Sequence, residues 1–417
     1  MTTDVRRSER AGYATHTSRI QHNPPTAPSR ARPGGRALTW IPLDGETNRE
    51  FLVLAATTGA LLVLGLVMTF SASFVQAVKQ TGDAFGIFAK QLLWCGVGLI
   101  PMLIAAAVDY RRWRSLVSPL MLATLVAMTA VLVPGLGVEV NGARRWFNLG
   151  IANFQPSELL KLALPLYVAH VVAARWSSVR RGEVGALMVP AIPVIAISGL
   201  LVLLEPDLET AVLITVIGGI VLYVAGLPGH IIAAGTGIAS AVAAAGVLST
   251  PFRRARFAAW LNPTAYADTF GYQTVQGFIA LGSGGWFGRG LGQGRGKWLY
   301  IPNAHTDFIF AIIGEELGLF GALFVLGLYV VLGITGVRIA RRAPDPFGRL
   351  LAAGITSWLL LQATINVGSV VGLFPVTGVT LPLVSFGGSS LVFTMIGLGV
   401  LMSIARAGRE PGREAVS

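Results

Sequence analysis

The run FLVLAATTGALLVLGLVMTFSAS, residues 51–73, indicates the fold class, because none of its side chains is charged. A helix needs about 20 apolar residues to cross the hydrocarbon core of a membrane, so this run predicts a transmembrane helix. Similar runs recur along the chain, and we place ten of them, at 51–73, 86–108, 115–134, 158–174, 186–204, 210–227, 230–249, 306–336, 350–372 and 390–406. The sequence therefore predicts an all-α integral membrane protein, a polytopic bundle of about ten transmembrane helices.

Composition supports this class. Of the 417 residues, 53% are hydrophobic and only 12% are charged, which leaves too little polar surface for a soluble protein of this size. The net charge of +12 comes from short cationic clusters between apolar runs, as expected of anchors that face a cytoplasm and anionic lipid. No basic helix or aromatic–basic module indicates nucleic-acid binding. The single cysteine, Cys95, cannot form an internal disulfide.

The distribution of arginines predicts the orientation. Residues 1–50 are rich in Arg, Ser, Pro and Gly and predict a disordered basic cytoplasmic tail, followed by a membrane domain at 51–407 and a cytoplasmic tail at 408–417. With both termini cytoplasmic, the arginine clusters at 111–114, 175–181 and 338–349 also face the cytoplasm, as the positive-inside rule requires. The predicted outer segments are then 135–157, 205–209, 250–305 and 373–389, of which 250–305, between helices 7 and 8, is the largest.

The large outer loop carries six cations against the charge trend, which suggests an anionic ligand: Arg253, Arg254, Arg256, Arg289, Arg295 and Lys297. Asp268 is the only carboxylate between Glu209 and Asp307, so it is the most economical general base in this loop. The alternative is an exposed aspartate that stabilises a turn before Gly271.

The glycine run at 282–296 is not a nucleotide-binding loop. It lacks a preceding strand and the GxGxxG spacing, and Trp298 follows Lys297 where a Walker loop needs Ser or Thr. Two interpretations stay open. Its backbone amides could approach a phosphate beside Arg289, Arg295 and Lys297, or the run could be a flexible connection.

Other polar residues lie at the predicted membrane boundary. Glu158 and Lys161 are three residues apart and share a helix face, either as a mutually neutralised pair or as a polar site within the membrane. Two interpretations are open for Asp207, in the sequence Glu205-Pro-Asp-Leu-Glu209. It is either part of a solvated outer turn or a residue that positions a cation or a basic side chain.

Near the eighth span, His305 and Asp307 precede Glu315 and Glu316, which we expect to bond within the bundle. There is no HExxH motif and no paired-cysteine spacing, which argues against a zinc site, whereas a magnesium-type ion held by carboxylates and substrate phosphates stays open. The proline- and glycine-containing segment 374–390 predicts a re-entrant or pocket-lining loop.

Three motifs together resemble a known family. Gln155-Pro-Ser-Glu-Leu-Leu-Lys161, Pro302-Asn-Ala-His-Thr-Asp-Phe-Ile-Phe310 and Leu381-Pro-Leu-Val-Ser-Phe-Gly-Gly-Ser389 make residues 50–407 similar to the SEDS proteins of bacterial shape, elongation, division and sporulation. Pro302-Asn-Ala-His305 and Thr380-Leu-Pro382 resemble the division branch more than the elongation branch.

The resemblance implies a ten-helix glycosyltransferase that polymerises lipid II into peptidoglycan strands at the outer face of the bacterial cytoplasmic membrane. It also implies a class B penicillin-binding transpeptidase and other division proteins as partners, at the division septum. No cofactor is certain, although a Mg²⁺ or Mn²⁺ ion stays open.

The resemblance also implies site residues. Asp268 takes the place of the family's essential aspartate shortly before Gly271-Tyr-Gln273, although it is two positions further from Asn262-Pro263 than in the family pattern. The implied substrate-binding residues are Glu158, Lys161, Asp207, Arg144, Gln155, Ser157, Tyr272, Gln273, Gln276, Lys297, His305, Asp307, Ser385, Gly387, Gly388 and Ser389.

Two functions of other classes remain. A flippase for lipid-linked precursors would also use polar residues in a helix bundle, but would need them near the midplane, whereas the charges here lie toward the outer face. A non-catalytic scaffold would recruit the transpeptidase through helix faces and the basic tail.

Overall fold

The computed structural model describes residues 49–140, 143–148, 150, 153–298, 300–302 and 304–408. Most of the predicted N-terminal tail, and the C-terminal tail after Gly408, lie outside these residues.

Long apolar helices dominate the described chain, which confirms the prediction of an all-α polytopic membrane protein. Within this part, nine helices are long and apolar enough to cross a membrane: α1 (Arg49–Thr81), α2 (Gly86–Ala107), α4 (Pro156–Ala174), α6 (Val184–Leu204), α7 (Leu208–Ala225), α8 (Gly229–Leu248), α11 (Ile309–Arg342), α12 (Pro346–Val370) and α13 (Gly388–Ala407). The predicted span 115–134 forms α3 (Val117–Val131), which has only 15 residues. The ten predicted segments thus correspond to nine full-length helices and one short one.

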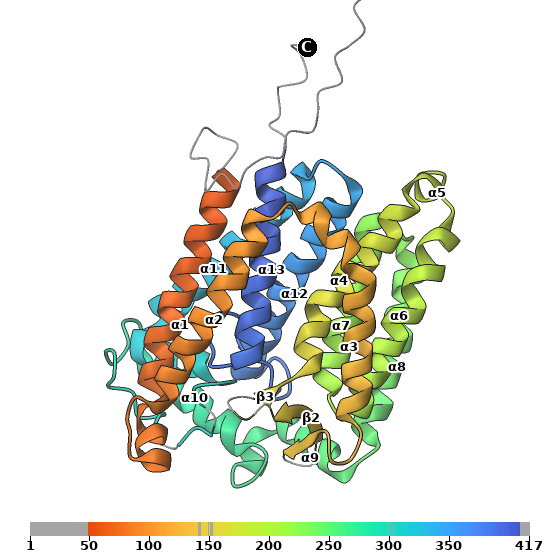
Figure 1. Cartoon of the computed structure of the whole chain (residues 1–417). Helices are drawn as coiled ribbons and strands as arrows, with labels where there is room; N and C mark the ends of the chain where they lie inside the picture. Colours follow the sequence, from red (N-terminus) through yellow and green to blue (C-terminus); the bar gives the residue numbers. More distant parts are fainter. Residues whose placement is uncertain are drawn as a thin grey trace, which may run out of the picture. The chain divides into compact units, whose positions relative to one another are not determined.

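Helix α3 is short because other structure occupies both of its ends. The 3-10 helix η2 (Tyr110–Ser115) precedes it, with the Asp109 carboxylate accepting a hydrogen bond from the Arg111 amide. A three-stranded antiparallel sheet follows it, made of β1 (Val138–Val140), β2 (Ala143–Asn148) and β3 (Asn153–Phe154) in that order. Glu139 pairs with Arg144, and Phe147 pairs with Phe154. In Figure 1, α3 runs alongside α4.

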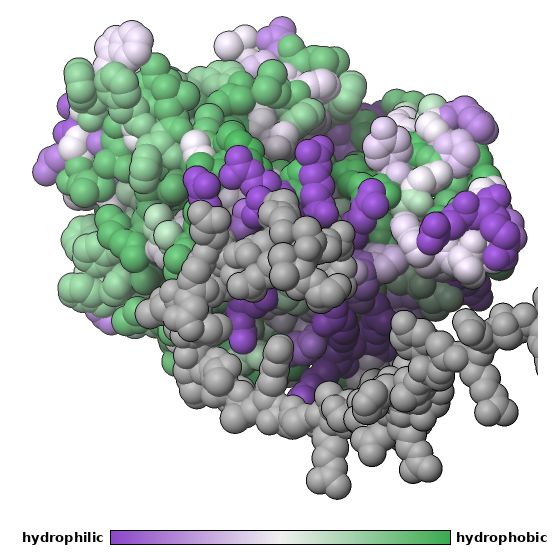
Figure 2. Space-filling model, turned by 90° about the horizontal axis from the view of Figure 1, so that it is seen from above, coloured by the Kyte–Doolittle hydropathy of each residue, from purple (hydrophilic) through white to green (hydrophobic). Residues whose placement is uncertain are grey.

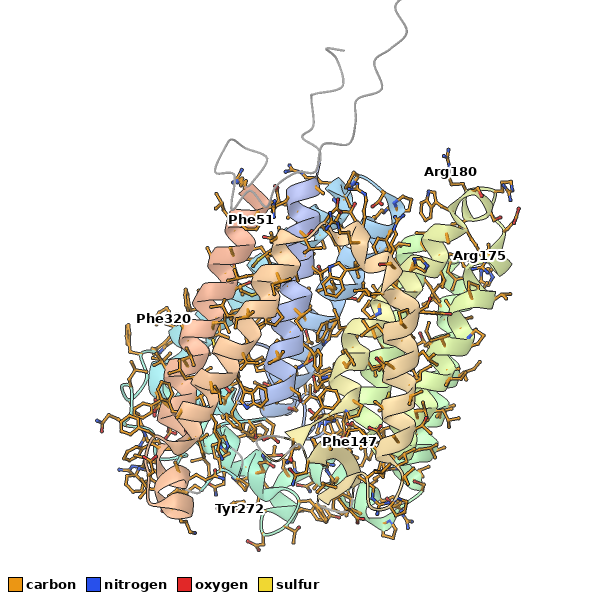
Figure 3. All side chains as sticks on the ribbon, viewed as in Figure 1. Phe51, Phe147, Arg175, Arg180, Tyr272 and Phe320 are labelled. Carbon is orange, nitrogen blue, oxygen red and sulfur yellow. The ribbon has the colours of Figure 1, made fainter. Side chains whose placement is uncertain are left out.

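The two ends of the bundle differ in structure (Figure 1). At one end, called here the sheet end, lie the sheet, α9 (Pro251–Leu261), η3 (Pro263–Tyr266) and α10 (Tyr272–Gly284). At the other, called here the arginine end, lie η2, α5 (Trp176–Arg180) and the end of α11. Figure 3 places Arg175 and Arg180 at the arginine end and Phe147 and Tyr272 at the sheet end. Figure 2 looks onto the arginine end and shows hydrophilic side chains beside hydrophobic flanks.

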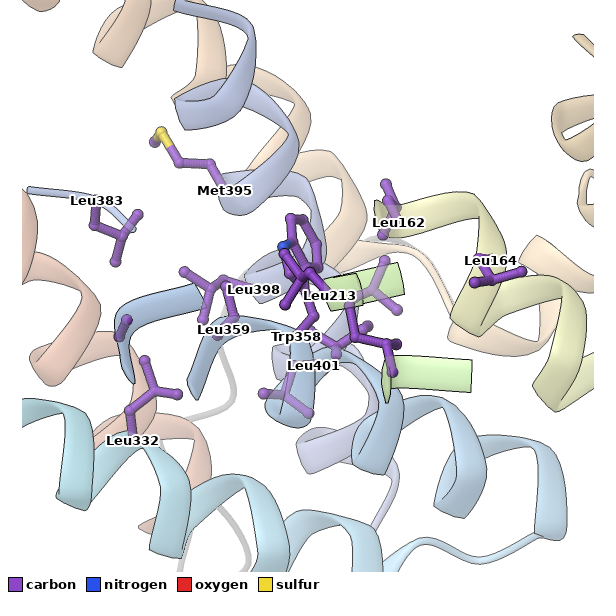
Figure 4. Packing of buried hydrophobic residues seen from close by; sticks show 14 of the residues in the cluster. Leu162, Leu164, Leu213, Leu332, Trp358, Leu359, Leu383, Met395, Leu398 and Leu401 are labelled. Carbon is purple, nitrogen blue, oxygen red and sulfur yellow. The ribbon is translucent and has the colours of Figure 1, made fainter. Parts of the chain in front are cut away.

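Helix α12 lies at the centre of the bundle and packs against α4, α7, α11 and α13. Its Trp358 is fully buried among leucines of several helices (Figure 4), including Leu162, Leu213, Leu398 and Leu401. A Cβ atom at Gly354 would lie 2.6 Å from the Pro165 ring, so the absent side chain lets α12 and α4 approach closely. Close van der Waals packing of this kind, rather than water exclusion, holds helices together inside a membrane.

Helix α11 differs from its predicted form. The predicted span 306–336 is a single helix, whereas the structure breaks it at Gly318, whose φ of 71° is left-handed. Glycine adopts such a φ without strain because it has no Cβ atom. The break separates a buried piece, Ile309–Leu317, from a longer piece that runs to Arg342.

Candidate functional site

Glu158 and Lys161 form a buried ion pair at the sheet end. Pro156 occupies the first turn of α4, where its missing amide costs nothing, and Glu158 follows where the helix dipole favours a negative charge. The Lys161 Nζ lies 2.8 Å from the Glu158 Oε1. The Glu158 Oε2 and the Ser157 hydroxyl are buried without a hydrogen-bond partner among the described residues. The pair is therefore neutralised, and still offers one carboxylate oxygen to a further donor.

A polar network continues from this pair into α12 and into residues 373–387 of the segment that joins α12 to α13, called here the 373–387 loop. The Lys161 Nζ lies 3.3 Å from the Gln362 Oε1, which also accepts a hydrogen bond from the Trp358 indole at 2.8 Å. The Gln362 amide nitrogen donates to the Thr380 carbonyl at 3.0 Å, and the Thr380 hydroxyl lies 3.1 Å from the Ser390 hydroxyl. Two predicted site residues are thus linked to the predicted pocket-lining loop.

Asp307 and His305 lie just before α11 and are both mostly buried. Asp307 accepts a hydrogen bond from the Thr306 hydroxyl at 2.9 Å, and its Oδ2 lies 3.5 Å from the amide nitrogen of Gln273 on α10. The Asn366 amide on α12 donates to the Asp307 carbonyl and to the Val379 carbonyl, each at 2.8 Å. Asn366 therefore fixes the start of α11 against the same loop that Gln362 holds.

Burial shifts the pKa values of Asp307 and His305 so that the neutral form of each side chain is favoured. It raises the pKa of Asp307 to about 6, with hydrogen bonds from Thr306 and Gln273 opposing this change. It lowers the pKa of His305 to about 4. The His305 ring packs against Phe386, with ring centroids 5.5 Å apart, and its Nδ1 has no described partner.

Arg145 rather than Arg144 approaches the acidic turn between α6 and α7. Its Nη1 lies 3.4 Å from the Asp207 Oδ2, and its Nε donates to the Glu205 carbonyl at 2.9 Å. Arg144 instead pairs with Glu139 at 3.2 Å. Neighbouring residues of a strand point to opposite faces, so only one of the two arginines can reach this turn. The sequence does not locate this alternation without the strand register, and a substrate-binding role for Arg144 stays a prediction.

Asp207 has a structural contact as well. Its Oδ1 accepts the Thr210 amide at 3.1 Å, the N-cap of α7. Glu205 is completely buried, and neither of its carboxylate oxygens has a described partner. Burial, and then the Asp207 charge, raise the pKa of Glu205 to about 8. A neutral Glu205 therefore lies beside the Arg145–Asp207 pair.

Arg256 on α9 connects the acidic turn between α6 and α7 to the 373–387 loop. It lies 3.7 Å from the Glu209 carboxylate and donates to the Val376 carbonyl. Its positive charge also opposes the rise in the pKa of Asp307, with a smaller effect than the hydrogen bonds to that carboxylate. Helix α7, helix α9 and the loop after α12 thus meet around one polar region at the sheet end.

Asp268 lies in the exposed turn between η3 and α10 and makes no hydrogen bond or ion pair with any described residue. The turn itself is ordered by its backbone, since the amides of Thr269 and Gly271 both donate to the Tyr266 carbonyl. Tyr272 and Gln276 follow on α10 and are half-buried. An exposed carboxylate on a backbone-ordered turn suits a base that must meet a substrate from outside.

The amides of the glycine run bind carboxylates of the chain itself. Glu315 accepts the amides of Arg295 at 2.7 Å and Gly296 at 2.9 Å, and Glu316 accepts those of Gly292 at 3.0 Å and Gly294 at 3.3 Å. This is the nest mechanism left open by the sequence, with protein carboxylates in place of a phosphate. The expectation that both glutamates bond within the bundle is met.

Lys297 belongs to this arrangement. Its Nζ lies 3.1 Å from Glu316 and 3.3 Å from the Ser71 hydroxyl of α1, which also donates to Glu316 at 2.7 Å. Its charge is thus neutralised internally, unlike the exposed cations Arg254 and Arg295.

The remaining predicted residues lie where the 373–387 loop enters α13. The Ser385 hydroxyl accepts the Leu381 amide at 2.9 Å, and Gln91 of α2 donates to the Ser385 carbonyl. A Cβ atom at Gly388 would lie 2.8 Å from the Trp94 ring, so this glycine allows α2 to approach. Gly387 and Ser389 flank it and are half-buried, as is Gln155 before α4.

Gln362, Asn366, Arg145 and Glu205 were not among the predicted site residues. Gln362 and Asn366 had a usable signal, because two amide side chains four residues apart in an apolar helix share one face. In the described part of the chain, no three His, Cys, Asp or Glu side chains gather as metal ligands.

Comparison with known proteins decides the family. A family model described as cell cycle protein, of the FtsW, RodA and SpoVE type, matches residues 52–410. The chain belongs to this family. It is 42% identical to the probable peptidoglycan glycosyltransferase FtsW of Mycobacterium tuberculosis, over 91% of this chain and 71% of that protein. It is 40% identical to stage V sporulation protein E of Bacillus subtilis, over 86% of this chain and 97% of that protein.

Solved structures of the SEDS family share the fold. RodA of Thermus thermophilus has 30% identity and a TM-score of 0.63, over 86% of this chain and 97% of RodA. A chain from a peptidoglycan synthase complex that coordinates polymerization and crosslinking has 32% identity and a TM-score of 0.70, over 85% of this chain and 96% of that chain. The predicted family, with its FtsW-like character, is confirmed.

Proposed function

We propose that this SEDS protein is a peptidoglycan glycosyltransferase that polymerises lipid II during cell division. Relatives across most of the chain are named peptidoglycan glycosyltransferase FtsW, which supports both the reaction and the division role. The observation that carries the assignment to a site is the exposed Asp268 turn at the same end of the bundle as the buried pair Glu158–Lys161 and the pair Arg145–Asp207.

In the proposed reaction, the Asp268 carboxylate takes the proton of the acceptor sugar hydroxyl. The hydroxyl oxygen forms a bond to the anomeric carbon of the donor, and the bond from that carbon to the lipid diphosphate breaks. The departing diphosphate gains negative charge, which a nearby cation stabilises. Arg254 is exposed on α9, whose Phe252 ring contacts that of Phe270 beside Asp268, and is suited to this, whereas Lys161 and Lys297 are neutralised by carboxylates.

We place the arginine end in the cytoplasm and the sheet end outside, because arginines concentrate on the cytoplasmic side of membrane proteins. The lipid-linked donor would then meet Asp268 at the outer face, at the division septum. A class B penicillin-binding transpeptidase is the proposed partner, supported by the likeness to a complex that coordinates polymerization and crosslinking.

The test is glycan-chain formation from lipid II by the purified protein with its transpeptidase. We expect Asp268→Asn to lose nearly all polymerisation and to keep the parental thermal stability, because the side chain is exposed and unbonded. Asp83→Asn is the control for the loss of another exposed loop carboxylate, between α1 and α2, although the Asp83 Oδ1 accepts the Phe85 amide at 2.9 Å.

Three results would contradict the proposal. Parental polymerisation by Asp268→Asn would show that another group is the base. Absence of polymer from both intact components, across added Mg²⁺ and Mn²⁺, combined with lipid II movement across vesicles, would favour a flippase. Parental wall synthesis in Asp268→Ala cells would favour a scaffold.

A further inference from the structure

An aromatic surface lies on the flank of the bundle, where the glycine run meets the break in α11. Trp286 is 65% exposed, Phe287 83% and Phe320 53%. The Phe320 ring centroid lies 6.0 Å from that of Trp286 and 5.2 Å from that of Phe287. Figure 3 shows Phe320 at the edge of the molecule, between the two ends. We call these three residues the aromatic cluster.

The backbone holds this cluster in place. The amides of Leu319 and Phe320 donate to the carbonyls of Gly285 and Trp286, and the amides of Arg289 and Gly290 donate to the carbonyls of Glu315 and Glu316. The carboxylates of the same two glutamates bind the next amides of the run. The cluster is thus fixed by hydrogen bonds on both sides, and its exposure does not come from a loose loop.

The height of the cluster follows from helix geometry. Phe320 and Arg338 are 18 residues apart on the continuous part of α11, which corresponds to about 27 Å at 1.5 Å per residue. The hydrocarbon core of a bilayer is about 30 Å thick. If the arginines at 338–342 lie at one membrane surface, Phe320 lies at the opposite interface.

The neighbouring surface is apolar as well. Helix α10 leads directly to Trp286 and exposes Phe278 and Ile279, whereas its Thr274, Gly277 and Ala280 are buried. A loop that faced only water would not expose so many large apolar side chains. Arg289, two residues after Phe287, is exposed, as a cation that contacts lipid phosphates would be.

We infer that the aromatic cluster anchors the glycine run and the end of α10 in the interface of the outer lipid leaflet. The occupant we commit to for this surface is lipid, and water, a second copy or a partner helix are the other outcomes of the test. Trp favours this depth because its ring reaches the acyl chains while its indole N–H stays hydrated, and the Phe287 and Phe320 rings add apolar area that lipid would remove from water. The anchor sets the height of α10, and hence of the Asp268 turn that precedes it, relative to lipid phosphates.

The test places a fluorescent label at Phe287. In a Cys95→Ser background, Phe287→Cys is labelled with an environment-sensitive dye and the full chain is reconstituted in phosphatidylcholine–phosphatidylglycerol nanodiscs. We expect a lipid spin label at acyl carbon 5 to quench the dye about twofold or more, and aqueous iodide to have little effect, as for an interfacial group. Ala265→Cys on η3 is the control, which iodide should quench and the lipid spin label should not.

Thermal stability checks that the labelled protein is folded, and Trp286→Cys serves as a second site if Phe287→Cys is unstable. Iodide quenching at Phe287 equal to that at Ala265 would overturn the inference in favour of water. Protection from both quenchers would overturn it in favour of a covering protein surface. Neither result depends on whether the protein polymerises lipid II.

Discussion

Replacing Glu316 by Gln tests how the glycine run is held. The carboxylate is fully buried and accepts hydrogen bonds from Ser71, Gly292 and Gly294, besides its 3.1 Å contact with Lys297. Gln has nearly the same shape but no charge, and its amide group would direct a donor at other donors. The substitution also leaves the Lys297 ammonium buried without its counter-ion.

The magnitude follows from these contacts. A hydrogen bond to a charged group contributes about 1.5–3 kcal/mol, and removing one partner of a buried ion pair costs about 3–5 kcal/mol. These terms overlap, so we expect Glu316→Gln to lower the free energy of unfolding by about 3–5 kcal/mol. Glu209→Gln is the control, because its contact with Arg256 is longer, at 3.7 Å, and partly exposed, for which about 1 kcal/mol or less is expected.

A double-variant cycle isolates the pair. Lys297→Met removes the stranded cation. The double variant should therefore lose about 1–3 kcal/mol less free energy of unfolding than the two single variants lose together. The assay is thermal unfolding in nanodiscs, with polymerisation from lipid II measured in parallel. A loss for Glu316→Gln no larger than that for Glu209→Gln, or strict additivity in the cycle, would refute this account.

Three further predictions concern other positions. Gly288→Ala should lower the melting temperature far more than Gly290→Ala, because both positions have a positive φ but only a Cβ at Gly288 would overlap the backbone of α11. Thermal stability should fall as pH rises from about 6.5 to 8, because the raised pKa of Glu205 makes its neutral form the favoured one in the folded state, whereas at lower pH the lowered pKa of His305 acts in the opposite direction. Glu205→Gln should flatten that part of the stability profile, and an unchanged profile would contradict the titration. Arg145→Ala should reduce lipid II polymerisation more strongly than Arg144→Ala, since only Arg145 contacts the turn between α6 and α7; equal rates would contradict this.

The sequence by itself determined the class of the protein, the places of its membrane helices and its family. Long charge-free runs have few alternatives to transmembrane helices, because every backbone amide in lipid must be hydrogen-bonded within its own segment. The three motifs brought Glu158, Lys161 and Asp307 forward as site residues, and the structure joins the first two in an ion pair.

Only the tertiary structure decided which polar groups meet. The backbone around the break at Gly318 bonds to residues 285–290, which are distant in sequence. The amides of the glycine run bind a pair of glutamates. The choice between Arg144 and Arg145 depends on strand register. Pairings of this kind are set by which helices pack together, and side-chain spacing along one segment carries no information about contacts between distant segments.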